Sequence, residues 1–171
     1  MSGISIKRIG ITDLDTDAVV NAANTRLLEG SGVCGAIFRA AGSRQMTEAC
    51  NKYGHCDEGD AVITPGFNLK AKYVIHTVGP RYSGGHNGEA DKLYSAYQSS
   101  LRLAMENGCH SIGFPVISAG IFGYPHEQAW EIAIKSCRDF QSANPEYDID
   151  IIFAVIDSEM HELGETVLGR S

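Results

Sequence analysis

The sequence predicts an α/β fold, built as one domain in which short buried strands alternate with helices. The chain has 171 residues, of which 43% are hydrophobic and 20% are charged, a size and composition that allow one substantial core. Compact apolar runs alternate along the chain with segments of helical spacing. No internal repeat, low-complexity tract or linker separates them, so we expect a single domain over residues 1–171.

Six segments have the pattern of strands. Residues 4–9 alternate apolar and polar side chains, as a half-exposed strand does. The other five are compact runs rich in Val and Ile, a pattern typical of strands covered on both faces. They comprise residues 17–23, 61–64, 73–79, 111–117 and 150–156.

Helices are predicted between and after these strands. Residues 89–107 and 126–140 each place apolar side chains on one stripe at helical spacing. Gly108 is a suitable stop for the first of these helices. A last helix is expected after the sixth strand, with Asp157 or Ser158 as its N-cap.

The charge and the cysteines restrict the classes of partner. With a formal net charge of −7, the chain lacks the basic face that broad nucleic-acid binding needs. No apolar run approaches the length of a membrane helix and the N-terminus lacks a signal-peptide core, so no membrane partner is expected. Five cysteines in a domain of this size favour reduced thiols in a cytoplasmic protein. Because ligands at zinc-site spacing are missing, we expect no metal, and we expect no cofactor.

Two glycine-rich loops each follow a predicted strand and precede a predicted helix, at residues 29–42 and 118–125. Ligands of open α/β sheets bind beyond the carboxyl ends of strands, and glycine there lets backbone N–H groups approach an anion. Two such loops could hold the two phosphates of a diphosphate, although each loop alone could also be only a tight turn. A third connection, residues 81–88, is predicted to be the most flexible loop.

Three long motifs are more specific than these patterns. The stretches "DAVVNAANTRLLEGSGVCGAIFRAAG", "GDAVITPGFNLKAKYVIHTVGP" and "FPVISAGIFGYP" resemble the macrodomain family, in order, from Ile11 to about Asp157. The resemblance is strongest to the bacterial enzymes that remove O-acetyl groups or protein-linked ADP-ribose. It implies a three-layer α/β/α sandwich with a mixed central sheet. It also implies ADP-ribose, or a related nucleotide, as ligand and an ADP-ribosylated protein as partner.

The resemblance assigns roles to individual residues. Phe122 matches an aromatic residue that packs against the distal ribose, and Asn24 matches an asparagine that orients this ribose for chemistry. From its spacing alone, Asn24 could equally form an Asx turn at the end of its strand. The implied phosphate loops and the remaining implied ligand contacts are Ile11, Gly30, Ser31, Gly32, Val33, Cys34, Ser118, Ala119, Gly120, Ile121, Gly123 and Ile156.

Two departures from the family pattern concern the base. Gly10 stands where relatives carry an aspartate that recognises the adenine amino group, and glycine cannot accept that hydrogen bond. Ile156 stands where an aromatic residue that stacks on adenine is common. Asp13 lies near Gly10 in the sequence. The pattern therefore leaves the base preference open.

Two further departures concern the chemistry. Cys34 and Phe38 replace an aspartate implicated in water activation and a histidine, and their spacing of four places both on one helix face toward the implied pocket. Losing both proton-handling groups removes a contribution of about 10²–10⁴-fold in rate. A thiol at a helix N-terminus can instead act as a nucleophilic thiolate. The alternative is that Cys34 is a small neutral residue filling the volume of the aspartate.

These features support a binding-type macrodomain as the leading hypothesis. The alternative from the enzyme class is a hydrolase that removes ADP-ribose from protein, or acetyl from O-acetyl-ADP-ribose. Its attacking water would be assisted by Asn24 and the ligand phosphates, with Cys34 as a second catalytic candidate. A third hypothesis is a protein-interaction regulator whose pocket is vestigial.

Overall fold

A single mixed sheet forms the centre of the computed structural model, which describes residues 3–171. The expected start of the domain at residue 1 lies outside this range. The strand order is β1-β6-β5-β2-β4-β3, and every neighbouring pair is parallel except β3 with β4. All six predicted strands are present near their expected bounds. The strands are β1 (Ile4–Lys7), β2 (Ala18–Ala22), β3 (Ala61–Pro65), β4 (Tyr73–Thr77), β5 (Ser111–Phe114) and β6 (Asp150–Ala154).

The predicted helices are also present, and one helix was not predicted. The segment of α2 is mostly polar and buries only Met46 and Cys50, so it lacks the apolar stripe that marks the longer helices. A short 3₁₀ helix, η1, follows β1. The bounds are η1 (Ile11–Asp13), α1 (Gly32–Ala41), α2 (Ser43–Asn51), α3 (Glu89–Glu106), α4 (His126–Ala143) and α5 (Ser158–Arg170).

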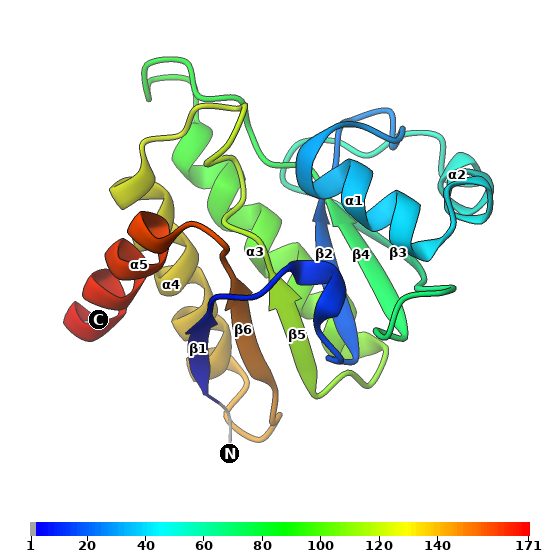
Figure 1. Cartoon of the computed structure of the whole chain (residues 1–171). Coiled ribbons are helices and arrows are strands. Elements are labelled where there is room, and N and C mark those ends of the chain that lie inside the picture. Colours follow the sequence, from blue (N-terminus) through cyan, green and yellow to red (C-terminus); the bar gives the residue numbers. More distant parts are fainter. Residues whose placement is uncertain (1–2) are drawn as a thin grey trace.

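Helices cover both faces of the sheet, which makes the expected three-layer α/β/α sandwich (Figure 1). On one face α3, α4 and α5 enclose a core that contains Tyr97, Trp130 and Phe153. On the other face α1 and α2 enclose a second core around Phe38 and Met46. Burial of these apolar faces against the sheet is the main source of stability in such a fold.

The position of β3 corrects one expectation. Residues 61–64 were expected to be covered on both faces, but β3 is the antiparallel edge strand, and three of its five residues are only half-buried. The hydroxyl of Tyr53 donates to the carbonyl of Ile63 at 2.6 Å, which satisfies one of the polar groups of this strand. A Val- and Ile-rich run therefore does not by itself distinguish a central strand from an edge strand.

The C-terminal helix is fixed at its start and in its middle. The Asp157 carboxylate accepts the backbone N–H of Glu159 at 2.9 Å, so the predicted N-cap is confirmed. Further along α5, a Cβ atom added at Gly164 would lie 2.6 Å from Cζ2 of Trp130. The indole N–H of Trp130 donates to the carbonyl of Met160 at 3.1 Å. A glycine therefore lets α5 approach the fully buried indole on α4.

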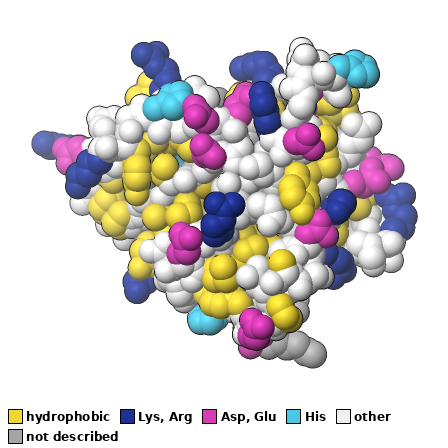
Figure 2. All heavy atoms as spheres, turned by 180° about the vertical axis from the view of Figure 1, so that it is seen from behind, with side chains coloured by type: hydrophobic (Ala, Val, Ile, Leu, Met, Phe, Trp, Pro, Cys, Tyr) yellow, Lys and Arg dark blue, Asp and Glu magenta, His cyan; other side chains and the backbone are white. Residues whose placement is uncertain are grey.

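The charged side chains of the reverse face are mixed by sign. Figure 2 shows Lys and Arg lying among Asp and Glu across this face, without a broad basic area. This agrees with the formal net charge of −7. Within residues 3–171, none of the helices combines the length and the apolar character that a membrane span requires.

Candidate functional site

The two glycine loops lie beside each other because their strands are neighbours. The first predicted stretch, residues 29–42, is a loop only as far as Ser31, because α1 begins at Gly32; this first loop belongs to residues 23–31, which join β2 to α1. The second loop belongs to residues 115–125, which join β5 to α4. β2 and β5 pair in parallel, so both loops leave the sheet at the same carboxyl edge. This is the edge at which open α/β sheets bind ligands.

The first loop presents unoccupied backbone donors at the start of α1. Ser31 is the N-cap residue but its side chain makes no capping hydrogen bond. Gly30, Ser31 and Gly32 are exposed, and Val33 is 37% exposed. A Cβ atom at Gly35 would lie 2.5 Å from the carbonyl oxygen of Gly30, so only glycine lets the loop fold back on the helix. The free N–H groups and the helix dipole favour an anion here.

The second loop is held in a tight conformation by its own backbone. Ser118 has a φ of 66°, which is unusual for a residue with a side chain, and its carbonyl accepts the N–H of Tyr124 at 2.9 Å. The N–H of Gly123 donates to the carbonyl of Gly120 at 2.9 Å. Ala119 and Phe122 are half-buried, whereas Ile121 at the tip is 78% exposed. The predicted residues of this loop therefore form one compact turn.

Asn24 and Cys34 both contact the backbone of Leu28. The Asn24 side chain accepts the N–H of Leu28 at 3.0 Å and donates to its carbonyl at 2.8 Å. The Cys34 thiol donates to the same carbonyl at 3.6 Å. A Cβ atom at Gly30 would meet Cys34 Sγ at 3.7 Å and Asn24 Nδ2 at 3.9 Å, so both side chains lie beneath the loop. The Asn24 side chain therefore makes a local backbone contact, but to the residue four positions on and not to the N–H two residues on that the expected Asx turn uses.

A buried polar chain runs from Cys34 away from the loop. Asn21 Nδ2 lies 3.6 Å from Cys34 Sγ and 3.1 Å from Nδ1 of His76. On the other side of the ring, His76 Nε2 lies 3.0 Å from the Thr64 hydroxyl, which donates to the Pro65 carbonyl. These contacts assign the proton of the neutral ring to Nε2. The sequence contains one signal for these buried polar contacts: Asn21 is a lone asparagine inside an apolar strand.

His76 is kept neutral by burial and is separated from the Cys34 thiol by Asn21. The His76 side chain is fully buried, and burial lowers its pKa to about 4. The amide of Asn21 lies between His76 and Cys34, so the histidine does not contact the Cys34 thiol, although its Nε2 lies 3.8 Å from Sγ of Cys50. The arrangement does not provide the adjacent base that nucleophilic cysteines use.

Phe38 lies deeper than expected. It was expected to face the implied pocket with Cys34, but its ring is fully buried and packs edge-on against His76, with 6.2 Å between ring centroids. Cys34 is 7% exposed and lies just below the loop. The two positions share a helix face, yet that face points into the second core rather than out of it.

The residues expected near a base lie at the ends of β1 and β6, which are neighbouring strands. A Cβ atom at Gly10 would lie 3.2 Å from Oδ2 of Asp13, so the exposed Asp13 carboxylate stands beside the glycine. Ile11 is buried, whereas Ile156 is 73% exposed. The structure thus brings a carboxylate close to the position that lacks one in the sequence.

Segment 80–82 is attached to the second loop. The hydroxyl of Ser118 donates to the Pro80 carbonyl at 2.7 Å, and the N–H of Tyr82 donates to the Phe122 carbonyl at 2.8 Å. The Arg81 guanidinium lies over the Phe122 ring, 4.9 Å from its centroid. The sequence patterns did not indicate these contacts.

The following residues, 83–88, correct the prediction of a flexible loop. The carboxylate of Glu89, at the start of α3, accepts the backbone N–H groups of Ser83, Gly85 and Asn87 at 2.7–3.0 Å. Burial raises the pKa of Glu89, but these hydrogen bonds outweigh it and lower the pKa to about 2. The Glu89 side chain is 2% exposed. The segment is therefore tied to one buried carboxylate.

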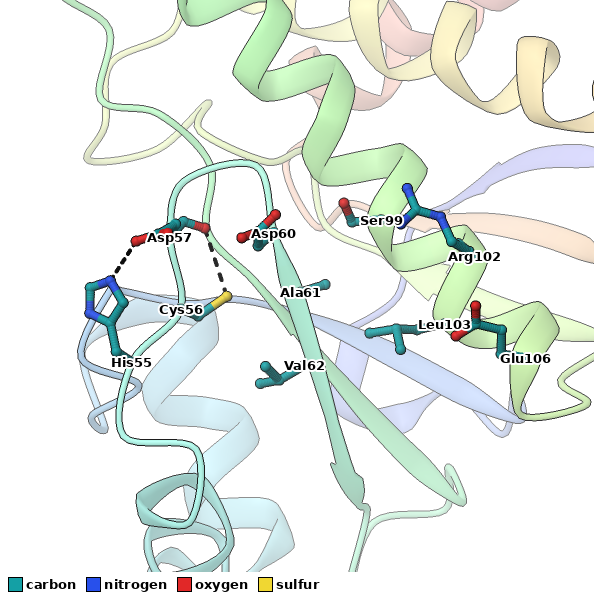
Figure 3. Close-up of a pocket in the computed structure, with 10 residues that line it drawn as sticks. All are labelled: His55, Cys56, Asp57, Asp60, Ala61, Val62, Ser99, Arg102, Leu103 and Glu106. Atoms are coloured by element: carbon teal, nitrogen blue, oxygen red, sulfur yellow. Dashed lines mark hydrogen bonds and ion pairs between the residues drawn. The ribbon is translucent and has the colours of Figure 1, made fainter.

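A cavity of about 310 Å³ lies elsewhere, between the edge strand β3 and α3 (Figure 3). His55 and Asp57 form an exposed pair at 2.6 Å on one side, and Arg102 and Glu106 stand on α3 opposite. None of the predicted ligand contacts lines it. Among residues 3–171, no three His, Cys, Asp or Glu side chains gather as a metal site would require. The five cysteines are all buried and unpaired.

Comparison with known proteins places this arrangement in a family. The Macro domain family model matches residues 20–133. A macro domain-containing protein of Chlorobaculum tepidum is 57% identical over 129 residues, 75% of this chain and 74% of the relative. The O-acetyl-ADP-ribose deacetylase of Cronobacter turicensis is 44% identical over 175 residues, 99% and 98% of the two chains. A solved macrodomain of Trypanosoma brucei in complex with ADP-ribose has a TM-score of 0.90 and 40% identity, covering 97% of this chain and 69% of that one. The chain therefore belongs to the macrodomain family.

Proposed function

We propose that this chain binds ADP-ribose, or a related nucleotide ribose diphosphate, across its two glycine loops. The observation that carries the proposal is the pairing of β2 with β5, which places both loops at one carboxyl edge with exposed backbone donors. Such donors at a helix N-terminus bind phosphate without needing a basic side chain. The ADP-ribose complex of the Trypanosoma brucei macrodomain supports the choice of ligand.

Within this proposal, the loops hold the diphosphate and Phe122 packs on the distal ribose. Gly30, Ser31 and Gly32 supply exposed backbone to one phosphate. The second loop, from Ser118 to Gly123, encloses the other phosphate. Ile11 and Ile156 flank the base. One domain spanning residues 1–171 is part of the proposal, since β6, near the end of the chain, pairs with β1.

The neighbourhood of Gly10 supports adenine as the base. The Asp13 carboxylate beside Gly10 can accept the amino-group hydrogen bond that glycine cannot. The exposed Ile156 can cover a ring face by apolar contact. The departures found in the sequence therefore do not require a different base.

Calorimetric titration tests the proposed ligand. ADP-ribose should bind, its GDP-based counterpart should bind more weakly, and free ribose phosphate should bind least. Asp13→Asn should lower the affinity for ADP-ribose by about tenfold, because the amide is a weaker acceptor than the carboxylate. If none of the three ligands binds to the unmodified protein, the proposed function is wrong.

A hydrolase is the second candidate, favoured by relatives named O-acetyl-ADP-ribose deacetylase that are 44% to 48% identical to this chain. In this case the ligand phosphates and Asn24 would position the attacking water, and an ADP-ribosylated protein would be a second substrate. One N–H of the Asn24 amide is bound to the Leu28 carbonyl, so its second N–H would contact the ribose.

Incubation with O-acetyl-ADP-ribose and with ADP-ribosylated protein tests the hydrolase. Because the aspartate and histidine positions hold Cys34 and Phe38, we expect slow turnover that falls at least about tenfold in Asn24→Ala. Cys34→Ser keeps a hydrogen-bond donor toward Leu28 and should change the rate little. Turnover that is unchanged in Asn24→Ala would refute this mechanism, and severe loss in Cys34→Ser would instead identify a catalytic thiol.

We also propose a cytoplasmic location. Five buried cysteines without a disulfide suit a reducing compartment.

A further inference from the structure

Arg81 is a cation fixed at the second loop without an acidic partner. Its guanidinium lies 4.9 Å from the Phe122 ring centroid, and within residues 3–171 it forms no ion pair. By contrast, the exposed Arg44 pairs with Glu48 and the exposed Arg170 pairs with Glu127. A lone guanidinium held on an aromatic ring beside a loop of backbone donors is suited to an anion.

The placement of Arg81 depends on a buried carboxylate further along the chain. Glu89 binds the N–H groups of Ser83, Gly85 and Asn87, and so fixes the segment that follows Arg81. The neighbouring Tyr82 is fixed by its backbone bond to Phe122 and by its ring contact with Tyr124, with 4.9 Å between centroids. The backbone that carries Arg81 is therefore anchored on both sides. This anchoring reduces the conformational entropy that the side chain loses when it contacts a ligand.

We propose that Arg81 is a ligand-binding residue that contacts the diphosphate of the bound nucleotide, and that Glu89 is its positioning residue. This inference rests on the proposed function and adds a side chain to a site otherwise built from backbone donors. The guanidinium supplies a full positive charge to a chain whose overall charge repels an anion. It favours a diphosphate over a ligand with less negative charge.

An alternative is that Arg81 only covers the Phe122 ring as a surface contact. The two cases differ in their dependence on salt. An ionic contact with a ligand weakens as the Debye length falls from about 10 Å at 0.1 M salt to about 3 Å at 1 M. A ring contact within the protein does not alter ligand affinity in this way.

The first test compares Arg81→Ala, Arg81→Lys and the unmodified protein by calorimetric titration with ADP-ribose. At about 0.1 M NaCl, Arg81→Ala should lower the affinity by about five- to tenfold, and this loss should shrink at about 1 M NaCl. The affinity of Arg81→Lys should lie between those of Arg81→Ala and the unmodified protein, because lysine keeps the positive charge but lacks the planar guanidinium. Arg44→Ala is the matched control: it removes the same charge from α2, where Arg44 pairs with Glu48. Its affinity should be unchanged.

The second test addresses the positioning role of Glu89. Glu89→Ala should weaken binding by a similar factor at about 0.1 M NaCl, and the double variant Arg81→Ala/Glu89→Ala should be little weaker than either single variant. Such non-additivity indicates that the two residues act through one contact. Because Arg81 is exposed, its variant keeps the proposal testable even if Glu89→Ala unfolds.

The outcomes separate the two levels of the proposal. If the unmodified protein binds ADP-ribose and Arg81→Ala binds equally well at about 0.1 M NaCl, Arg81 is not a ligand contact while the proposed function stands. Additive losses in the double variant would overturn the positioning role of Glu89. No binding by the unmodified protein would overturn both the function and this inference.

Discussion

Cys34, one of the two candidate catalytic residues, makes a local contact within the first loop. Its thiol donates to the carbonyl of Leu28, which the side chain of Asn24 also binds. A carboxylate at this position could not donate and would face the carbonyl oxygen with like partial charge. The thiol is therefore compatible with this conformation of the first loop in a way that an ionised aspartate would not be.

His76 should make the stability of the protein depend on pH. Its pKa is about 4 in the folded protein and 6.5 when unperturbed, so the unfolded chain binds more protons between these values. Stability should be constant above about pH 6.5 and fall as the pH is lowered toward 4, by about 3 kcal/mol in total. Denaturant unfolding of the unmodified protein and of His76→Gln, between about pH 7 and 4.5, measures this.

The variant provides the control for that experiment. His76→Gln is expected to be less stable at pH 7, because a packed and hydrogen-bonded ring is lost, but its stability should vary less over this range. Glu89 titrates in a separate window, from 4.5 down to about 2, and contributes little above it. Equal slopes for the two proteins would show that His76 is not the group responsible.

Among the helices and strands, the spacing of apolar side chains predicted those helices that are long and have one apolar face. α3 and α4 follow from their stripes, and the N-cap Asp157 follows from its position before α5. The polar α2 was missed because it lacks an apolar stripe, and the edge position of β3 was missed because it depends on which strands become neighbours. The order of strands in a sheet depends on contacts between distant segments, which the hydrophobic periodicity of a single segment does not predict.

Close packing of α5 on α4 gives a prediction with a matched pair. Gly164→Ala would place a Cβ atom 2.6 Å from Trp130 and should lower the free energy of unfolding by about 1–3 kcal/mol. Gly169→Ala, in the same helix, meets nothing within 4 Å and should change stability by less than about 1 kcal/mol, toward greater stability. Thermal or denaturant unfolding of both variants measures the difference. Equal effects would contradict the proposed contact.

At the scale of the whole molecule, the sequence predicted the two loops but not their surroundings. The loops are visible as glycine-rich stretches after strands, and their proximity follows once β2 and β5 pair. The contacts of Arg81 with Phe122 and of Asn21 with His76 join segments distant in the chain, which local patterns do not reveal. The glycines and polar residues of segment 81–88 favoured the prediction of a flexible loop. Composition does not reveal that one buried carboxylate, that of Glu89, binds three backbone N–H groups of this segment.

The buried chain from Asn21 to Thr64 has a consequence for proton traffic. Its central ring is fully buried and neutral above about pH 4, and its other members are amide and hydroxyl groups. Its low pKa therefore makes the neutral His76 ring a poor acceptor for a proton from a water at the first loop. If the proposed hydrolysis takes place at the loops, we expect its proton to leave on the side that faces the solvent. The buried side of this site is therefore poorly suited to proton transfer.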